Sequence, residues 1–146
     1  MKRQTATILI DRPPVEVFRY MDDVSREREW QPNLRAAEQE PPGPSKPGTC
    51  KRYVSEFMGR EIRNTYVVRE VQSGRRIVTE TTPESAIDAR CEIVIEPEGA
   101  GARVTLAVEG RPRGFLRLLG KGLLERAYHK ELSASLARLK ARMEAT

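Results

Sequence analysis

The chain has 146 residues, of which 38% are hydrophobic and 32% charged, with a formal net charge of +5. This size predicts one domain over residues 1–146 with a real core, and the short apolar runs exclude a membrane-spanning helix. The 26 basic residues are interspersed with 21 acidic ones, and few aromatic rings are available for base stacking. We therefore expect a solvated basic surface and no nucleic-acid partner.

The N-terminal part predicts one strand followed by two short helices. Gln4–Asp11 is rich in β-prone residues and is ended by a Pro-Pro pair. Proline suits a first helical turn, so Val15–Met21 is expected to be a short helix. Ser25 is expected to cap a second short helix over Arg26–Trp30.

The middle of the chain predicts an antiparallel sheet. A short strand is expected at Leu34–Glu40. From Thr49 onward, alternation of apolar and charged residues marks strands at Thr49–Phe57, Glu61–Gln72, Arg76–Thr82, Asp88–Glu96 and Ala102–Glu109. The Pro- and Gly-rich residues 41–48 form a stiff loop between two of them. Short connections make successive strands antiparallel neighbours, and one apolar face means that the sheet covers something on one side.

The C-terminal run Gly114–Ala145 predicts one long helix. Its apolar residues from Leu124 onward recur in steps of three and four, which keeps one face apolar. Gly120 and Gly122 lie where this stripe shifts, so we expect a break or bend there. The preceding piece, Phe115–Leu119, would then lie near a cavity mouth, and the rest of the helix would seal the core.

This order of elements resembles the helix-grip fold of the Bet v 1/START-like (SRPBCC) superfamily, and more nearly the bacterial polyketide cyclase/dehydrase family. The segments that carry the resemblance are Ile8–Phe18, Asp22-Asp23 and Trp30-Gln31-Pro32. The resemblance implies an α+β fold in which a curved antiparallel sheet of six or seven strands wraps around the long C-terminal helix. It also implies a cavity between them for an apolar molecule.

The resemblance and the strand phases together predict the residues around that cavity. They are Phe18, Trp30, Tyr53, Phe57, Tyr66, Thr79, Ile93, Leu106, Leu116, Leu119 and Tyr128. The expected function is binding of a hydrophobic small molecule such as a lipid or polyketide, without a cofactor, by a monomer or homodimer. Trp30 is expected either to plug one end of the core or to present a ring face to the cavity, with its N–H near solvent or a carbonyl.

Two other functions stay open. A polyketide cyclase or aromatase would need polar groups inside the cavity, and the inward candidates are Tyr53, Ser55, Asn64, Tyr66, Thr79 and Tyr128, with Asp88 and Arg90 at a rim. A polar cluster with perturbed ionisation would favour this enzyme, and an all-apolar lining would reject it. An interaction module using the basic surface of the long helix is the third hypothesis, which an exposed apolar patch would favour.

Sequence motifs give no catalytic or metal centre. Cys50 and Cys91 are far apart without a CxxC pair, so we expect free, buried or half-buried thiols and no metal site. His129, the single histidine, is expected on the helix surface. The start Met1-Lys2-Arg3-Gln4 lacks the apolar region of a signal peptide, so we expect a cytoplasmic protein.

Overall fold

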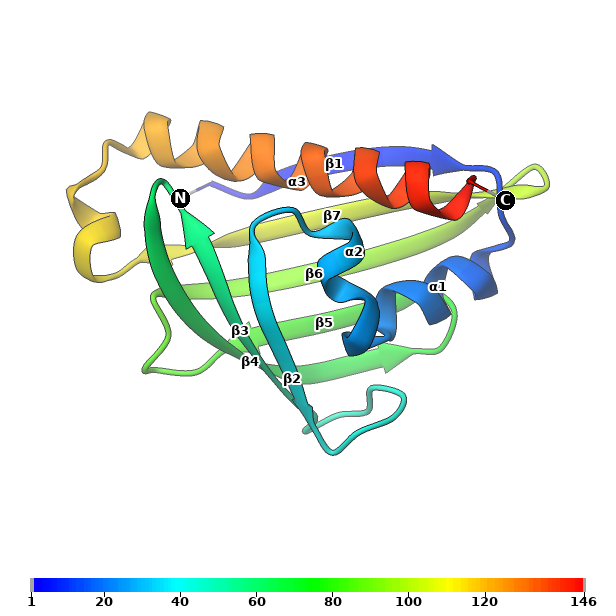
Figure 1. The fold of residues 1–146 in the computed structure, drawn as a ribbon, viewed down its shortest axis with the longest axis horizontal. Coiled ribbons are helices and arrows are strands. Elements are labelled where there is room, and N and C mark those ends of the chain that lie inside the picture. Colours follow the sequence, from blue (N-terminus) through cyan, green and yellow to red (C-terminus); the bar gives the residue numbers. More distant parts are fainter. Residues whose placement is uncertain (1, 146) are drawn as a thin grey trace.

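The computed structural model describes residues 2–145 as a seven-stranded sheet with helices on one side (Figure 1). In chain order the elements are β1 (Gln4–Ile10), α1 (Pro14–Asp22), the 3-10 turn η1 (Val24–Arg26), α2 (Glu27–Trp30), β2 (Leu34–Glu40), β3 (Cys50–Phe57), β4 (Arg60–Gln72), β5 (Arg76–Thr81), β6 (Ile87–Glu98), β7 (Gly101–Pro112), the 3-10 turn η2 (Gly114–Leu118) and α3 (Lys121–Met143).

The sheet is antiparallel throughout, in the order β1-β7-β6-β5-β4-β3-β2. The register shifts in β4 between Val68 and Glu70, and in β2 between Leu34 and Ala36. Such irregularities bend a strand and increase its twist. Figure 1 shows the result, a strongly curved sheet whose concave side faces α3 and the two short N-terminal helices.

The helix α3 packs along this concave side and closes the core. Its buried residues Leu124, Leu136 and Leu139 lie on one face, and the first of these belongs to a different apolar cluster from the other two. One cluster joins α3 to β1, β7 and α1, and the second joins its N-terminal turn to β3, β6 and η2. The space between sheet and helix is therefore packed at both ends. No helix within residues 2–145 is long and apolar enough to cross a bilayer.

The structure confirms the helix-grip fold and corrects three local details. The predicted single helix Gly114–Ala145 is divided into η2 and α3, and the expected break is confirmed at Gly120, which immediately precedes α3. Gly122, in contrast, lies within the first turn of α3 without breaking it. The cap of the second short helical segment is the carboxylate of Asp23, which accepts a hydrogen bond from the Ser25 backbone N–H at 3.0 Å, so Ser25 is not the capping residue.

Substitution of two glycines by alanine is expected to change stability in opposite directions. A Cβ at Gly110 on β7 would lie 1.9 Å from the carbonyl oxygen of Asp88 on the paired strand β6, whereas a Cβ at Gly122 meets nothing within 4 Å. Gly110→Ala is therefore expected to lower the free energy of unfolding by about 2–3 kcal/mol. Gly122→Ala should raise it by about 0.5–1 kcal/mol, because alanine is the better helix former. Urea unfolding of both variants measures the two changes in the free energy of unfolding. Equal effects would contradict the close contact between the backbones of β6 and β7 at Gly110.

Candidate functional site

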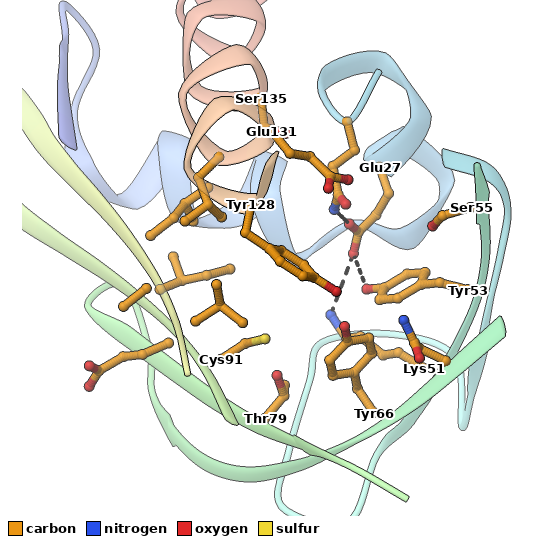
Figure 2. A pocket seen from close by; sticks show the side chains of 18 of the residues that line it. Glu27, Lys51, Tyr53, Ser55, Tyr66, Thr79, Cys91, Tyr128, Glu131 and Ser135 are labelled. Carbon is orange, nitrogen blue, oxygen red and sulfur yellow. Dashed lines mark hydrogen bonds and ion pairs between the residues drawn. The ribbon is translucent and has the colours of Figure 1, made fainter. Parts of the chain in front are cut away.

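A cavity of about 180 Å³ lies between the concave face of the sheet and the helices α2 and α3. Its lining has an apolar part, formed by Met21, Ile77, Ile93, Leu106, Val108 and Leu132. It also has a polar part, formed by Glu27, Lys51, Tyr53, Asn64, Tyr66, Tyr128 and Glu131. Figure 2 shows the polar side chains converging from α2, α3 and the strands β3 and β4. The cavity is thus two-sided in its chemistry.

The polar part is built on Lys51, a lysine that is only 4% exposed. Its ammonium Nζ lies 3.3 Å from the carboxylate of Asp22 and 3.9 Å from that of Glu27. A buried charge is costly unless it is paired and hydrogen-bonded, so these two carboxylates are what keeps Lys51 inside. Asp22 is held in turn by Ser45, whose backbone N–H and hydroxyl both donate to it. This contact ties the loop after β2 to the end of α1.

Glu27 occupies the centre of the polar cluster and is 2% exposed. The hydroxyl of Tyr53 donates to its Oε1 at 2.7 Å, and the amide of Gln31 donates to its Oε2 (Figure 2). Burial raises the pKa of Glu27 from 4.5 to about 7, because desolvation outweighs the opposing effects of Lys51 and Tyr53. Near neutral pH this group is therefore present both as a protonated carboxyl, which can donate a proton, and as a carboxylate, which can accept one.

A second carboxyl reaches the cavity from α3. Desolvation raises the pKa of Glu131, partly offset by a hydrogen bond with Asn33. Glu131 follows Tyr128 by three residues, so both lie on the same face of α3. The ring of Tyr128 stacks on Phe57 with a centroid separation of 4.8 Å, and burial raises the pKa of its hydroxyl well above the usual value.

A pair of tyrosines from neighbouring strands completes the polar part. The rings of Tyr53 and Tyr66 lie 5.5 Å apart, and burial raises both hydroxyl pKa values well above 10. The thiol of Cys91, hydrogen-bonded with Tyr66 and Thr79, has its pKa raised to about 12 by burial. These groups are therefore neutral hydrogen-bonding partners at physiological pH.

The arrangement can do two things chemically. It can orient a polar group of an otherwise apolar ligand by hydrogen bonds, and it can move a proton at Glu27 next to the ammonium of Lys51. Within residues 2–145 no three His, Cys, Asp or Glu side chains are grouped to hold a metal ion.

The structure brings together most of the residues that the sequence predicted around the cavity. Those in the lining are Trp30, Tyr53, Phe57, Tyr66, Thr79, Ile93, Leu106 and Tyr128, together with the polar candidates Ser55 and Asn64. Phe18 lies instead on the buried face of α1 in the core, and Leu116 and Leu119 pack in the apolar cluster under η2. Asp88 and Arg90 are also outside the lining, with ion-pair distances of 3.8 Å to Arg113 and Glu109.

Sequence reasoning missed, among the charged residues of the lining, Glu27, Lys51 and Glu131. Lys51 shares the strand phase of Tyr53, Ser55 and Phe57, so the period of two already placed it inward. Glu27 precedes Trp30 by three residues on the same helical face. Their charge predicts exposure to solvent, because lysine and glutamate are almost never fully buried unless paired.

Trp30 combines both roles that were considered for it. It is 3% exposed, it packs in the core cluster, and it also lines the cavity. The expectation that its N–H meets solvent or a carbonyl is wrong: within residues 2–145 its buried Nε1 has no hydrogen-bond partner. Its indole is thus an unused donor in the wall of the site.

The geometry agrees with comparisons to known proteins. The model of the family "Polyketide cyclase / dehydrase and lipid transport" matches residues 1–144, and the chain belongs to this family. No curated protein matches.

Solved structures show the same fold at low sequence identity. The protein TTHA0849 from Thermus thermophilus superposes with a TM-score of 0.84 at 23% identity, over 99% of this chain and 98% of the other. A START superfamily protein from Mycobacterium smegmatis gives 0.83 at 13% identity, over 98% and 97%. The di-domain ARO/CYC protein BexL gives 0.76 at 18% identity, over 99% of this chain and 50% of the other.

The raised pKa of Glu27 predicts a pH-dependent stability. Between pH 4.5 and about 7 the native state keeps a proton that the unfolded state releases, so stability falls as the pH rises through this window. At about 1.4 kcal/mol per pKa unit, the wild type should lose about 2–3 kcal/mol from pH 5 to pH 8 relative to Glu27→Gln. Urea unfolding at both pH values, monitored by Trp30 fluorescence, measures this loss of stability.

The matched control is Glu38→Gln, which changes a carboxylate whose side chain is 76% exposed. This variant should keep the wild-type pH dependence. A Glu27→Gln variant with the same pH dependence as the wild type would contradict the assigned ionisation.

Proposed function

We propose that the protein binds a hydrophobic small molecule, a lipid or polyketide or a compound of similar polarity, in the cavity between the sheet and α3. The observation that carries the proposal is the two-sided lining, in which an apolar wall meets a buried cluster of hydrogen-bonding groups. Ligand sites of this kind bury an apolar body and orient it by a few placed polar groups.

The family supports the same class of ligand, because its description covers both polyketide cyclisation and lipid transport. In this proposal the ligand body contacts Ile93, Leu106 and Phe57, and its polar end meets Glu27, Lys51 or the Trp30 N–H. The proposal needs no cofactor and no nucleic acid, and it is compatible with a cytoplasmic monomer or homodimer.

Ligand binding should report through the single tryptophan. Titration with medium-chain fatty acids, sterols or polycyclic aromatics is expected to change Trp30 emission saturably, because the ring lines the cavity. Thr79→Phe places a large ring in the cavity wall and should weaken binding at least about tenfold. Val94→Phe adds the same ring on the opposite face of the sheet and should bind as the wild type does.

Calorimetry with the same compounds decides the outcome. Saturable binding that Thr79→Phe removes supports the proposal. Absence of binding for every apolar class, or equal binding by both variants, would count against a ligand in this cavity.

The buried cluster favours a second candidate, a cyclase-type enzyme. Here the Glu27 carboxylate removes a proton from a carbon between two carbonyl groups, and the Lys51 ammonium holds the resulting enolate oxygen. The enolate carbon forms a bond to a second carbonyl carbon of the same chain, whose oxygen takes up a proton. Loss of water then gives the ring alkene. A pKa of about 7 suits Glu27 to this exchange.

A short poly-β-keto thioester distinguishes the two candidates. For an enzyme, mass spectrometry should show a protein-dependent product lighter by one water, and Glu27→Gln should lower its rate at least about a hundredfold. The same variant should still quench Trp30 on binding. Binding without any product would exclude the cyclase candidate and support ligand binding as the function.

A further inference from the structure

One end of the molecule carries exposed apolar side chains that the cavity does not explain. The described residues contain five exposed large hydrophobic side chains, and three of them, Met58, Leu118 and Leu123, belong to the β3–β4 turn, η2 and the first turn of α3. Leu118 is 87% exposed, the largest value of the five. The guanidinium of Arg60 lies 4.3 Å from the ring centroid of Phe115, which joins the β3–β4 turn to η2. We call residues 58–60 and 111–123 the η2 surface.

The η2 surface is basic as well as apolar. It contains Arg60, Arg111, Arg113, Arg117 and Lys121, and its two segments contain no Asp or Glu. Its five positive charges equal the net charge of the whole chain, +5.

Three of these cations form no side-chain hydrogen bond, ion pair or ring contact with any of residues 2–145. Arg111, Arg117 and Lys121 are exposed and form no ion pair within residues 2–145. On the outer face of the sheet, by contrast, arginines are neutralised by glutamates, as in the pairs Arg76–Glu92 and Arg69–Glu80. Uncompensated positive charge therefore lies directly beside the exposed leucines of the η2 surface.

We propose that the η2 surface docks on a membrane that contains anionic lipids. Exposed leucines on a short turn can enter the boundary between headgroups and acyl chains, while neighbouring arginine and lysine side chains stay at the level of the phosphates. Unpaired cations next to such residues add attraction to an anionic leaflet. A carboxylate-rich protein would match the charge, but it would leave the outward Leu118 in solvent unless it also supplied an apolar pocket.

The inner side of the same surface leads toward the cavity. Leu116, fully buried under η2, packs in one cluster with Phe57 and Tyr128, and these two rings line the cavity. Docking would thus place this end of the cavity against the lipid phase, a consequence that rests on the proposed function. The docking itself does not require a ligand.

Cosedimentation with vesicles tests the proposal. The purified chain should bind phosphatidylcholine vesicles that contain about a third phosphatidylglycerol at least about tenfold more than pure phosphatidylcholine vesicles, and salt should weaken this binding. Arg117→Glu/Lys121→Glu and, separately, Leu118→Ser/Leu123→Ser should each reduce binding at least about tenfold. All four side chains are exposed, so both variants should keep the wild-type melting temperature.

Matched controls make the same kinds of change outside the η2 surface. Arg28→Glu/Arg75→Glu reverses two exposed cations of α2 and the β4–β5 turn, and Leu9→Ser removes a leucine that is 51% exposed on β1. Both should bind vesicles as the wild type does.

Three results would overturn the proposal. They are no vesicle binding, equal loss in the control variants, and binding to RNA or an acidic protein while vesicles are ignored. Because ligand titration of the cavity is a separate measurement, failure here leaves the proposed function intact, and failure there leaves docking intact.

Discussion

The pairing of Lys51 with Asp22 and Glu27 is the constraint on which the rest of the site depends. An ammonium on the inner face of a sheet must bring its counter-charges inward with it. Asp22 ends α1, Glu27 begins α2, and Ser45 belongs to the loop after β2, so this one cation fixes three segments against β3. The cluster makes one side of the cavity polar. Apolar side chains at the same positions would pack there with a smaller desolvation cost than these charged groups.

The same cluster explains why ligand binding and catalysis are hard to separate in this fold. Two carboxylates face one ammonium, and Glu27 sits at the point where it is neither firmly ionised nor firmly protonated near neutral pH. Such a group can accept a hydrogen bond from a ligand hydroxyl when it is ionised and donate one to a ligand carbonyl when it is protonated. Turnover would require in addition a carbon acid held within reach of its oxygen. The distinction therefore depends on the ligand rather than on the protein alone.

Sequence patterns predicted the fold well because the period changes sharply from two to about 3.6 at Gly114. The strand from Thr49 and the break at Gly120 follow directly from alternation and from glycine propensity, and the structure places that strand at Cys50–Phe57. The site was predicted less completely. Aromatic and aliphatic members such as Phe57 and Ile93 follow from strand phase. Lys51 has the same inward phase, but a charged side chain is expected in solvent, and its burial depends on carboxylates distant in sequence. Leu116 was predicted to line the cavity and packs instead in the apolar cluster under η2, where the chain forms a 3-10 turn and not a continuous helix.

The pairing of β1 with β7 has a consequence for how the chain reaches this fold. Residues 4–10 find their hydrogen-bonding partners only at residues 102–108, and β1 is also the strand that contacts α3 most. During synthesis β1 therefore emerges before the other strands and stays without a partner until β7 has left the ribosome. Contacts so distant in sequence slow folding and leave an unpaired edge open in the meantime. The hairpins from β3 to β7 can form early, whereas closure of the sheet by its first strand comes late.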